Sequence, residues 1–285
     1  MKPTHRRSAI ATTAVLALVL ALGVGTGGAA GAATPAWASA ASAAIHPGVM
    51  TETAGAQCTA NFIFRSGSDV FIGQAAHCSG TGEATETNGC SAQSLPLGTP
   101  VTVDGATRPG TLVYNSWLTM QALGETDADA CAYNDLGLIR LDPADVGRVN
   151  PSIPTYGGPK GIAGPTKAGD TVSSYGNSSL RQGIAVLSPK TGVSLGDQGN
   201  GWSHQVYTAT PGIPGDSGSA FLDSKGQALG VLSTLALAPL PLSNNVSDLA
   251  HMLAYARSHS GFSDLSVVEG TEAFHPSLVG LLPLG

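Results

Sequence analysis

The sequence predicts an all-β protein made of antiparallel barrels or a sandwich, with one helix late in the chain. Many short apolar and β-branched runs are separated by glycine and proline turns, a pattern typical of antiparallel strands. Apolar residues make up 42% of the 285 residues and charged residues 11%, which is ample material for a sizeable core. Helical spacing is confined to one segment near the end of the chain.

Residues 1–43 are predicted to be an export signal that is removed. Lys2, Arg6 and Arg7 give a positive start, and the apolar run 10–24 is shorter than the roughly 20 residues that span a bilayer. Two alanine-rich cleavage sites fit, Ala36-Trp37-Ala38 and Ala41-Ser42-Ala43. We therefore expect a secreted, extracellular protein with no membrane contact after signal removal, rather than an anchored one.

Charge and cysteine content narrow the class of protein further. Signal removal takes away three basic residues and no acid, which lowers the formal net charge from −6 to −9, so no nucleic-acid partner is expected. In an oxidising compartment the four cysteines are expected to pair, in one of three ways. They are Cys58, Cys78, Cys90 and Cys131. Zinc sites usually contain closely spaced cysteine pairs such as C-x-x-C, and the sequence has none, so no metal is expected.

The first half of the mature chain is predicted to start at Cys58, after a polar arm at 44–57 that is too short to fold alone. A hairpin follows, with a strand at 58–65, a turn at 66–69 and a returning strand at 70–73. Small polar residues predict a loop at 79–98. Further short strands are expected at 101–103, 110–114 and 136–141.

Five prolines and many glycines between residues 142 and 169 predict a crossover, so the two halves are expected to meet near 143–170. The second half is also mainly β. Its expected strands lie at 171–175, 183–187, 202–207, 220–222 and 228–233, with a turn at 223–226.

One helix is expected to follow, capped by Asn245 or Ser247 and running to about His259. Its apolar face has the spacing i, i+3, i+4, i+7, at Leu249, Met252, Leu253 and Ala256. The mature domain is thus predicted to span 58–260, and the tail 261–285 carries no pattern that predicts its structure.

The segment Gly215-Asp216-Ser217-Gly218 suits an exposed nucleophile. A serine hydroxyl is a weak nucleophile at neutral pH and needs an imidazole base and a buried carboxylate that orients the base. His77 ends the first hairpin, and Asp135 enters an apolar strand, where an unpaired carboxylate would be costly. Taken singly, each has an ordinary alternative, since a lone histidine is often a surface residue and a lone aspartate a turn cap.

Together these residues resemble the chymotrypsin-like (trypsin-fold) serine proteases. Residues 75–78 look like that family's histidine signature, 134–141 like its aspartate strand and 215–218 like its nucleophile loop, in the family's order. Two more segments are similar, 174–177 to its aromatic-glycine turn and 230–233 to its substrate-pairing strand. The resemblance covers about Cys58 to His259. It implies two antiparallel six-stranded β-barrels with a C-terminal helix, in a secreted bacterial member of the family.

The resemblance implies a serine endopeptidase that hydrolyses peptide bonds of protein or peptide substrates as a monomer, without a cofactor. Ser217 would attack the carbonyl, His77 would take and return the proton, and Asp135 would orient His77. The N–H groups of Gly215 and Ser217 would form the oxyanion hole. One alternative is a catalytically silent relative that keeps the fold as a binding module. An esterase of another fold would instead place its serine in G-x-S-x-G and its histidine last.

A disulfide from Cys58 to Cys78 would hold His77 against the neighbouring strand, and Cys90 and Cys131 remain for a second one. Most animal members of the family pair the aspartate before the serine with a freed Ile-Val-Gly-Gly amino terminus, and no such motif precedes Cys58. Asp216 therefore needs another cation, because an unpaired buried carboxylate is costly. Arg181 is our candidate for the cation that pairs with Asp216.

Four residues are predicted to bind substrate, Pro211, Ser233, Thr234 and Leu235. Pro211 stands where trypsin-like members carry the acid that binds Lys or Arg, so tryptic specificity is not expected. Leu235 stands where open pockets usually carry glycine and would partly block the site. We infer a shallow, apolar pocket for small or medium side chains.

Overall fold

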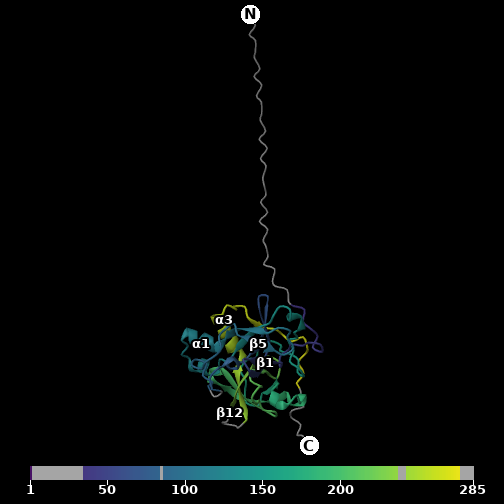
Figure 1. The fold of residues 1–285 in the computed structure, drawn as a ribbon, viewed down its shortest axis with the longest axis vertical. Helices are drawn as coiled ribbons and strands as arrows, with labels where there is room; N and C mark the ends of the chain where they lie inside the picture. Colours follow the sequence, from purple (N-terminus) through teal and green to yellow (C-terminus); the bar gives the residue numbers. More distant parts are fainter. Residues whose placement is uncertain (2–34, 84–85, 237–241, 277–285) are drawn as a thin grey trace. The chain divides into compact units, whose positions relative to one another are not determined.

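The computed structural model describes residue 1 and residues 35–83, 86–236 and 242–276. The chain divides into two units, residues 1–32 and 33–285, and every described helix and strand lies in the second (Figure 1). The predicted export signal, 1–43, therefore falls mostly outside the described residues. Among the residues described, no helix has the length and apolar character needed to cross a bilayer.

The first half of the chain forms an antiparallel sheet. Its order is β14-β3-β4-β7-β6-β5-β1-β2. The strands are β1 (Met50–Thr53), β2 (Ala56–Thr59), β3 (Ile63–Ser66), β4 (Asp69–Gln74), β5 (Pro100–Val103), β6 (Gly110–Asn115), β7 (Gly137–Arg140) and β14 (Ser266–Val267). This sheet has eight strands instead of the expected six, because the arm before Cys58 contributes β1 and the tail contributes β14.

The second half forms the expected closed barrel of six strands, in the order β10-β13-β12-β11-β8-β9. The strands are β8 (Thr171–Tyr175), β9 (Pro189–Gln198), β10 (Ser203–Thr208), β11 (Ala220–Leu222), β12 (Ala228–Ala236) and β13 (Ser243–Asp248). In Figure 1, β1 and β5 of the first sheet lie above β12 of the barrel. The predicted all-β fold is confirmed.

The longest described helix, α3 (Leu249–His259), begins later than predicted. Its cap is Asp248, whose side chain accepts a 2.8 Å hydrogen bond from the N–H of His251. Asn245 and Ser247 are not the cap, because both lie in β13, which pairs with β10 on one side and β12 on the other. The predicted apolar face is confirmed, since Leu249, Met252, Leu253 and Ala256 are all buried.

Several short helices were not predicted. Two are α-helical, α1 (Ser116–Leu123) and α2 (Ala128–Tyr133). The others are the 3-10 turns η1 (Ala76–Ser79), η2 (Val146–Arg148), η3 (Ser179–Arg181), η4 (Ala185–Leu187) and η5 (Gly199–Gly201). The strand predicted at 183–187 is wrong, because the backbone turns through positive φ at Gln182 and Gly183 and continues as η4.

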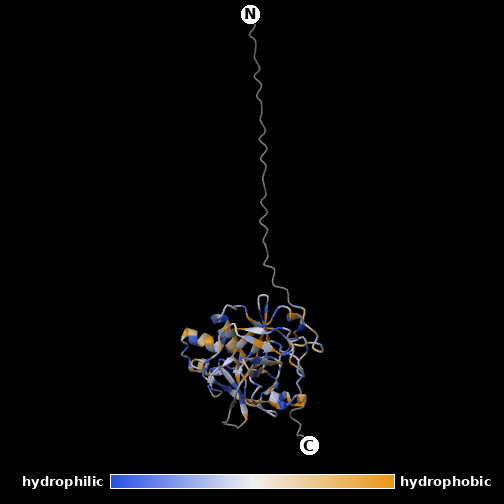
Figure 2. Ribbon diagram, in the orientation of Figure 1, coloured by the Kyte–Doolittle hydropathy of each residue, from blue (hydrophilic) through white to orange (hydrophobic). Residues whose placement is uncertain are grey.

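The apolar core is divided between the two halves and the surface where they meet. Figure 2 shows hydrophobic residues, in orange, along the strands and on α1. One buried cluster joins first-sheet residues such as Phe64 and Leu138 to Val231 of the barrel and Met252 of α3. Burial of one such large side chain stabilises the fold by about 1.5 to 3 kcal/mol. The packing of α3 therefore fixes the two halves against each other.

Residues on both sides of the predicted domain 58–260 belong to the fold. Ala38 donates a 2.9 Å backbone hydrogen bond to Val149, and Trp37 packs against the core of the first sheet. In the tail, the N–H of Val268 donates to the carbonyl of Ile63 at 2.8 Å. Trp37 and Ala38, which we expected to leave with the signal, thus contact the folded domain.

Candidate active site

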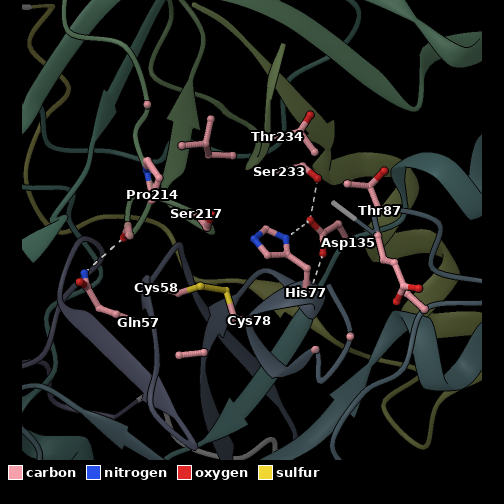
Figure 3. Close-up of a pocket in the computed structure, with 18 of the residues that line it drawn as sticks. Gln57, Cys58, His77, Cys78, Thr87, Asp135, Pro214, Ser217, Ser233 and Thr234 are labelled. Atoms are coloured by element: carbon pink, nitrogen blue, oxygen red, sulfur yellow. Dashed lines mark hydrogen bonds and ion pairs between the residues drawn. A yellow bond between two sulfur atoms is a disulfide. The ribbon is translucent and has the colours of Figure 1, made fainter. Parts of the chain in front are cut away.

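Strand pairing brings His77 and Asp135 together. β4 pairs with β7 so that Gln74 lies opposite Gly137, which sets η1 after β4 beside the residues that precede β7. The backbone N–H of His77 donates to Oδ1 of Asp135 at 2.9 Å, and Nδ1 of its ring lies 2.7 Å from Oδ2. The ring nitrogen Nε2 is left to face the cavity (Figure 3).

The charge interaction and hydrogen bonds between His77 and Asp135 outweigh burial, which by itself would disfavour the charged form of each. Burial alone would raise the pKa of Asp135, but the imidazole of His77 and the hydroxyl of Ser233 hold it below its ordinary value. Burial alone would lower the pKa of His77, yet the Asp135 carboxylate raises it above 6.5. The hydroxyl of Ser233 donates to Oδ2 of Asp135 at 2.7 Å. This is the arrangement in which a buried carboxylate can orient an imidazole that acts as a base.

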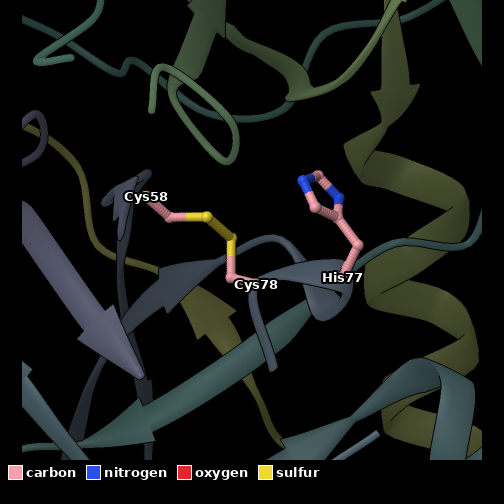
Figure 4. Close-up of side chains that lie close together, drawn as sticks. All are labelled: Cys58, His77 and Cys78. Carbon is pink, nitrogen blue, oxygen red and sulfur yellow. A yellow bond between two sulfur atoms is a disulfide. The ribbon is translucent and has the colours of Figure 1, made fainter. Parts of the chain in front are cut away.

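Both expected disulfides are present, Cys58–Cys78 and Cys90–Cys131. Figure 4 shows the first of them beside the imidazole of His77. Among the described residues, Cys58, Cys78 and His77 are the one cluster of three potential metal-ligand side chains, with their atoms within 4.8 Å of one another. Both sulfurs are bonded to each other, so this cluster does not offer the thiolates that a metal ion would need.

The loop 211–219 between β10 and β11 presents Ser217 to the same cavity. Gly215 and Gly218 both have positive φ, at 93° and 87°. A Cβ on Gly218 would lie 2.6 Å from the carbonyl oxygen of Thr59, so glycine lets this loop lie against the first sheet. Thr59 fixes the loop there, because its N–H donates to the carbonyl of Ser217 and its hydroxyl to that of Gly215, both at 2.8 Å.

Two backbone donors of this loop are free. Within the part of the chain that the structure describes, the N–H groups of Gly215 and Ser217 donate no hydrogen bond, whereas those of Asp216 and Gly218 are bonded within the fold. The side chain of Ser217 is partly exposed to the cavity that His77 also lines (Figure 3). A free pair of amides beside a hydroxyl is the arrangement that can bind a developing oxyanion.

Asp216 is held by two cations. Its carboxylate, fully buried, contacts Nη2 of Arg181 and lies 2.9 Å from Nζ of Lys190. Its Oδ1 also accepts from the N–H of Ser178 at 3.0 Å, and its Oδ2 from the N–H of Ile213 at 3.1 Å. Arg181 was expected from the sequence, but Lys190 was not.

The cavity has a volume of about 680 Å³ and includes two of the residues predicted to bind substrate, Ser233 and Thr234. Pro211 is not one of the residues that line the cavity. Its carbonyl oxygen accepts hydrogen bonds from Nη2 of Arg181 and Nζ of Lys190. The side chain of Leu235 lies outside what the structure describes. Sequence reasoning missed several lining residues, which no local motif marks: Trp117, Gly212, Ile213, Leu232 and Asn244.

Asn244 and Trp117 both line the cavity. The Oδ1 of Asn244, a buried residue of β13, accepts from the N–H of Gly212 at 2.9 Å. The indole of Trp117, on α1, lies with its ring centroid 6.4 Å from that of His77. Two acids, Glu83 and Glu86, also line the cavity.

A six-stranded closed barrel and a second antiparallel sheet that carries a His-Asp pair are the arrangement of the chymotrypsin-like fold, which confirms the fold inferred from the sequence. Thermobifida fusca Protease A superposes with a TM-score of 0.51 at 20% identity, covering 80% of this chain and 100% of its own. A Nocardiopsis protease gives 0.48 at 16% identity, covering 78% of this chain and 98% of its own. At such identities the likeness concerns the fold. No protein-family model matches the sequence, and no curated protein matches it by sequence.

Proposed function

We propose that this protein is a secreted serine endopeptidase that hydrolyses peptide bonds through an acyl-enzyme. The observation that carries the proposal is the 2.7 Å contact between His77 and the buried Asp135, in a cavity that Ser217 also lines. The fold shared with Thermobifida fusca Protease A supports it. The two disulfides fit export to an oxidising compartment.

The reaction proceeds in two steps. Nε2 of His77 takes the proton of the Ser217 hydroxyl as its oxygen attacks the scissile carbonyl, and the imidazolium then gives this proton to the leaving amine. Water, deprotonated by the same imidazole, hydrolyses the acyl-enzyme and frees Ser217. Asp135 holds the tautomer with the proton on Nδ1 and stabilises the imidazolium.

The N–H groups of Gly215 and Ser217 receive the oxyanion of each tetrahedral intermediate. Loss of one such donor typically costs about 3 to 4 kcal/mol of transition-state stabilisation. The positive φ of Gly215 supports this role, because glycine adopts this conformation without strain and adds no side chain beside its amide.

Specificity is not tryptic in this proposal. Gly212, Ile213 and Asn244, which line the cavity together with Ser217, are uncharged. Arg181 and Lys190 lie beneath the loop at Pro211 and share the single carboxylate of Asp216. A Lys or Arg side chain entering beside this loop would meet one excess positive charge, which is unfavourable in a partly desolvated site. Small or medium uncharged residues are the proposed preference before the scissile bond.

A phosphonylating serine reagent tests the proposed function directly. Purified mature protein is expected to take up one phosphonyl group, mapped to Ser217 by mass spectrometry. The variant His77→Ala is expected to lose this labelling, and Ser68→Ala, an exposed turn residue, to keep it. A folded wild-type protein that takes up no label would contradict the proposal and favour the silent binding module.

A further inference from the structure

Asn244 places a polar side chain where the pattern of its strand calls for an apolar one. It lies two residues before Val246 on β13, so both side chains point to the same face of the strand. Val246 packs in the core of the second barrel. Asn244 is 1% exposed and lines the cavity that Ser217 also lines. A buried amide is costly unless its hydrogen bonds are made, so an amide at this position needs a reason.

The fold uses only part of the hydrogen-bonding capacity of this amide. The Oδ1 of Asn244 accepts a 2.9 Å hydrogen bond from the N–H of Gly212, which settles the orientation of the amide. Among the described residues, its Nδ2 has one acceptor, the carbonyl of Thr234, at 3.4 Å, which is longer than the roughly 2.7 to 3.2 Å of most such bonds. A carboxamide has two N–H groups and two acceptor lone pairs. Asn244 therefore keeps one N–H and one lone pair for another group.

A glycine leaves this amide open to the cavity. A Cβ on Gly212 would lie 3.0 Å from Nδ2 of Asn244, 3.1 Å from its Oδ1 and 2.7 Å from Cδ2 of Leu232. The φ of Gly212 is not positive, so it is the space, and not the backbone conformation, that requires a glycine here. A larger residue would cover both polar atoms of Asn244. Gly212, Leu232 and Asn244 therefore enclose one part of the cavity.

This part of the cavity lies beside the candidate nucleophile. The carbonyl of Leu232 accepts a 2.7 Å hydrogen bond from the N–H of Gly218, the residue after Ser217. Ile213 belongs to the same loop as Ser217 and also lines the cavity. Leu232 and Ile213 offer apolar surface, and the amide of Asn244 offers polar atoms. A side chain with methylene groups and a polar, uncharged end matches this lining.

We propose that Asn244 is a specificity-determining residue that selects a carboxamide side chain, that of glutamine or asparagine, before the scissile bond. Its free N–H donates to the carbonyl oxygen of that side chain, and its free lone pair accepts from the NH2 group. A carboxylate offers no donor and an ammonium no acceptor, whereas an apolar side chain leaves both polar atoms of Asn244 unpaired. This inference rests on the proposed function and names its substrate class.

Four peptide substrates that differ only in the residue before the scissile bond test this selection in the wild-type protein. They carry glutamine, methionine, glutamate or lysine there, and methionine has nearly the length of glutamine without its hydrogen-bonding groups. The glutamine peptide should have the highest kcat/KM, about 10- to 100-fold above that of the methionine peptide, because a site with buried polar groups rejects an analogue that leaves them unpaired. A methionine peptide cleaved as efficiently as the glutamine peptide would overturn the inference and leave the proposed function intact.

The variant Asn244→Asp tests whether this residue makes the selection. Aspartate keeps an oxygen for the N–H of Gly212 but has no N–H to offer to a substrate. The variant should therefore lose the preference for glutamine over methionine, and its kcat/KM for the lysine peptide relative to the glutamine peptide should rise by about 10-fold or more. Asn245→Asp is the matched control, because the Nδ2 of Asn245 donates to Oγ1 of Thr234 at 3.2 Å and Asn245 does not line the cavity. It should keep the wild-type ratios.

Ratios between substrates separate selection from catalysis, since a poorly folded protein or a less reactive Ser217 lowers kcat/KM for every peptide alike. A folded Asn244→Asp that keeps the wild-type ratio of glutamine to methionine would overturn the inference. If this variant does not fold, the wild-type ratio alone decides. Wild-type protein that cleaves none of the four peptides and takes up no phosphonyl label would remove both the proposed function and this inference.

Discussion

The hydroxyl of Ser233 donates a 2.7 Å hydrogen bond to Oδ2 of Asp135. The same oxygen lies 2.7 Å from Nδ1 of His77, so one carboxylate oxygen serves both partners. Ser233 belongs to β12 of the second barrel, whereas His77 and Asp135 belong to the first half. The hydrogen bond therefore joins the two halves of the chain at the candidate site.

Replacement of this serine tests how far Asp135 depends on it. In Ser233→Ala, the carboxylate keeps both contacts with His77 but loses one hydrogen bond in a buried position. A hydrogen bond to a charged group contributes about 1.5 to 3 kcal/mol. Because Asp135 keeps its two contacts with His77, we expect a loss near the lower value, which corresponds to a fall in kcat/KM of about 10-fold. Steady-state hydrolysis of a peptide ester measures kcat/KM, and Ser68→Ala is the control variant. An unchanged rate would show that His77 alone holds Asp135.

The pH dependence of the reaction follows from the raised pKa of His77. Only the neutral imidazole can accept the proton of Ser217, so kcat/KM should rise with pH through a midpoint above the ordinary histidine value of 6.5. The linked effect on stability has the opposite direction. Below its unfolded pKa the charged His77 stabilises the fold through Asp135, and this contribution is lost as pH rises through the folded pKa. A pH profile with its acid limb below 6.5 would contradict this assignment.

The candidate site could be predicted from the sequence because its parts carry local motifs. His77, Asp135 and Ser217 each stand in a short pattern with a chemical reason, and the cost of burying Asp216 alone pointed to a cation such as Arg181. No comparable pattern marks Lys190. A lysine at the start of a strand is ordinarily exposed. Its burial here depends on barrel closure and on Gly176, where a Cβ would lie 2.8 Å from Cε of Lys190, and both are tertiary features.

The errors in the predicted elements have the same origin. Asn245 and Ser247 were each predicted as a possible helix cap, yet both lie in β13, because strands are available on both sides. Ile184 and Val186 favour a strand by composition, but Gln182 and Gly183 turn the chain before one can form. Tertiary pairing and backbone turns thus overrode local preference.

The packing of Trp37 limits where a predicted export signal could be cut without disturbing the fold. This indole packs on the first sheet, and Ala38 is bonded to Val149, so cleavage after Ala38 or Ala43 would remove contacts of the folded domain. An earlier site, Ala30-Gly31-Ala32, also has small residues at the required spacing. We therefore expect the exported protein to begin at Ala33. Amino-terminal sequencing and intact mass check this, and a start at Ser39 or Ala44 would contradict it.

His204 predicts a pH-dependent stability that is separate from the candidate site. Its ring is 1% exposed and lies between two carboxylates, with Nδ1 2.7 Å from Asp197 and Nε2 2.9 Å from Asp248. Burial alone would lower the pKa of His204, but these two acids raise it above 6.5. Its stabilising effect is therefore complete below the unfolded pKa and is lost as pH rises through the folded pKa.

The variant His204→Gln removes this charge and is expected to lower the free energy of unfolding by about 3 kcal/mol at pH 6, because both carboxylates lose a buried partner. Its deficit should shrink as pH rises from 6 to 9, because the charged form of His204 in the wild type becomes less populated. Urea unfolding at both pH values measures this. His251→Gln, which alters a half-exposed contact with Asp248, is the matched control and should cost less. A deficit that stays constant from pH 6 to 9 would mean that His204 acts by packing and not by charge.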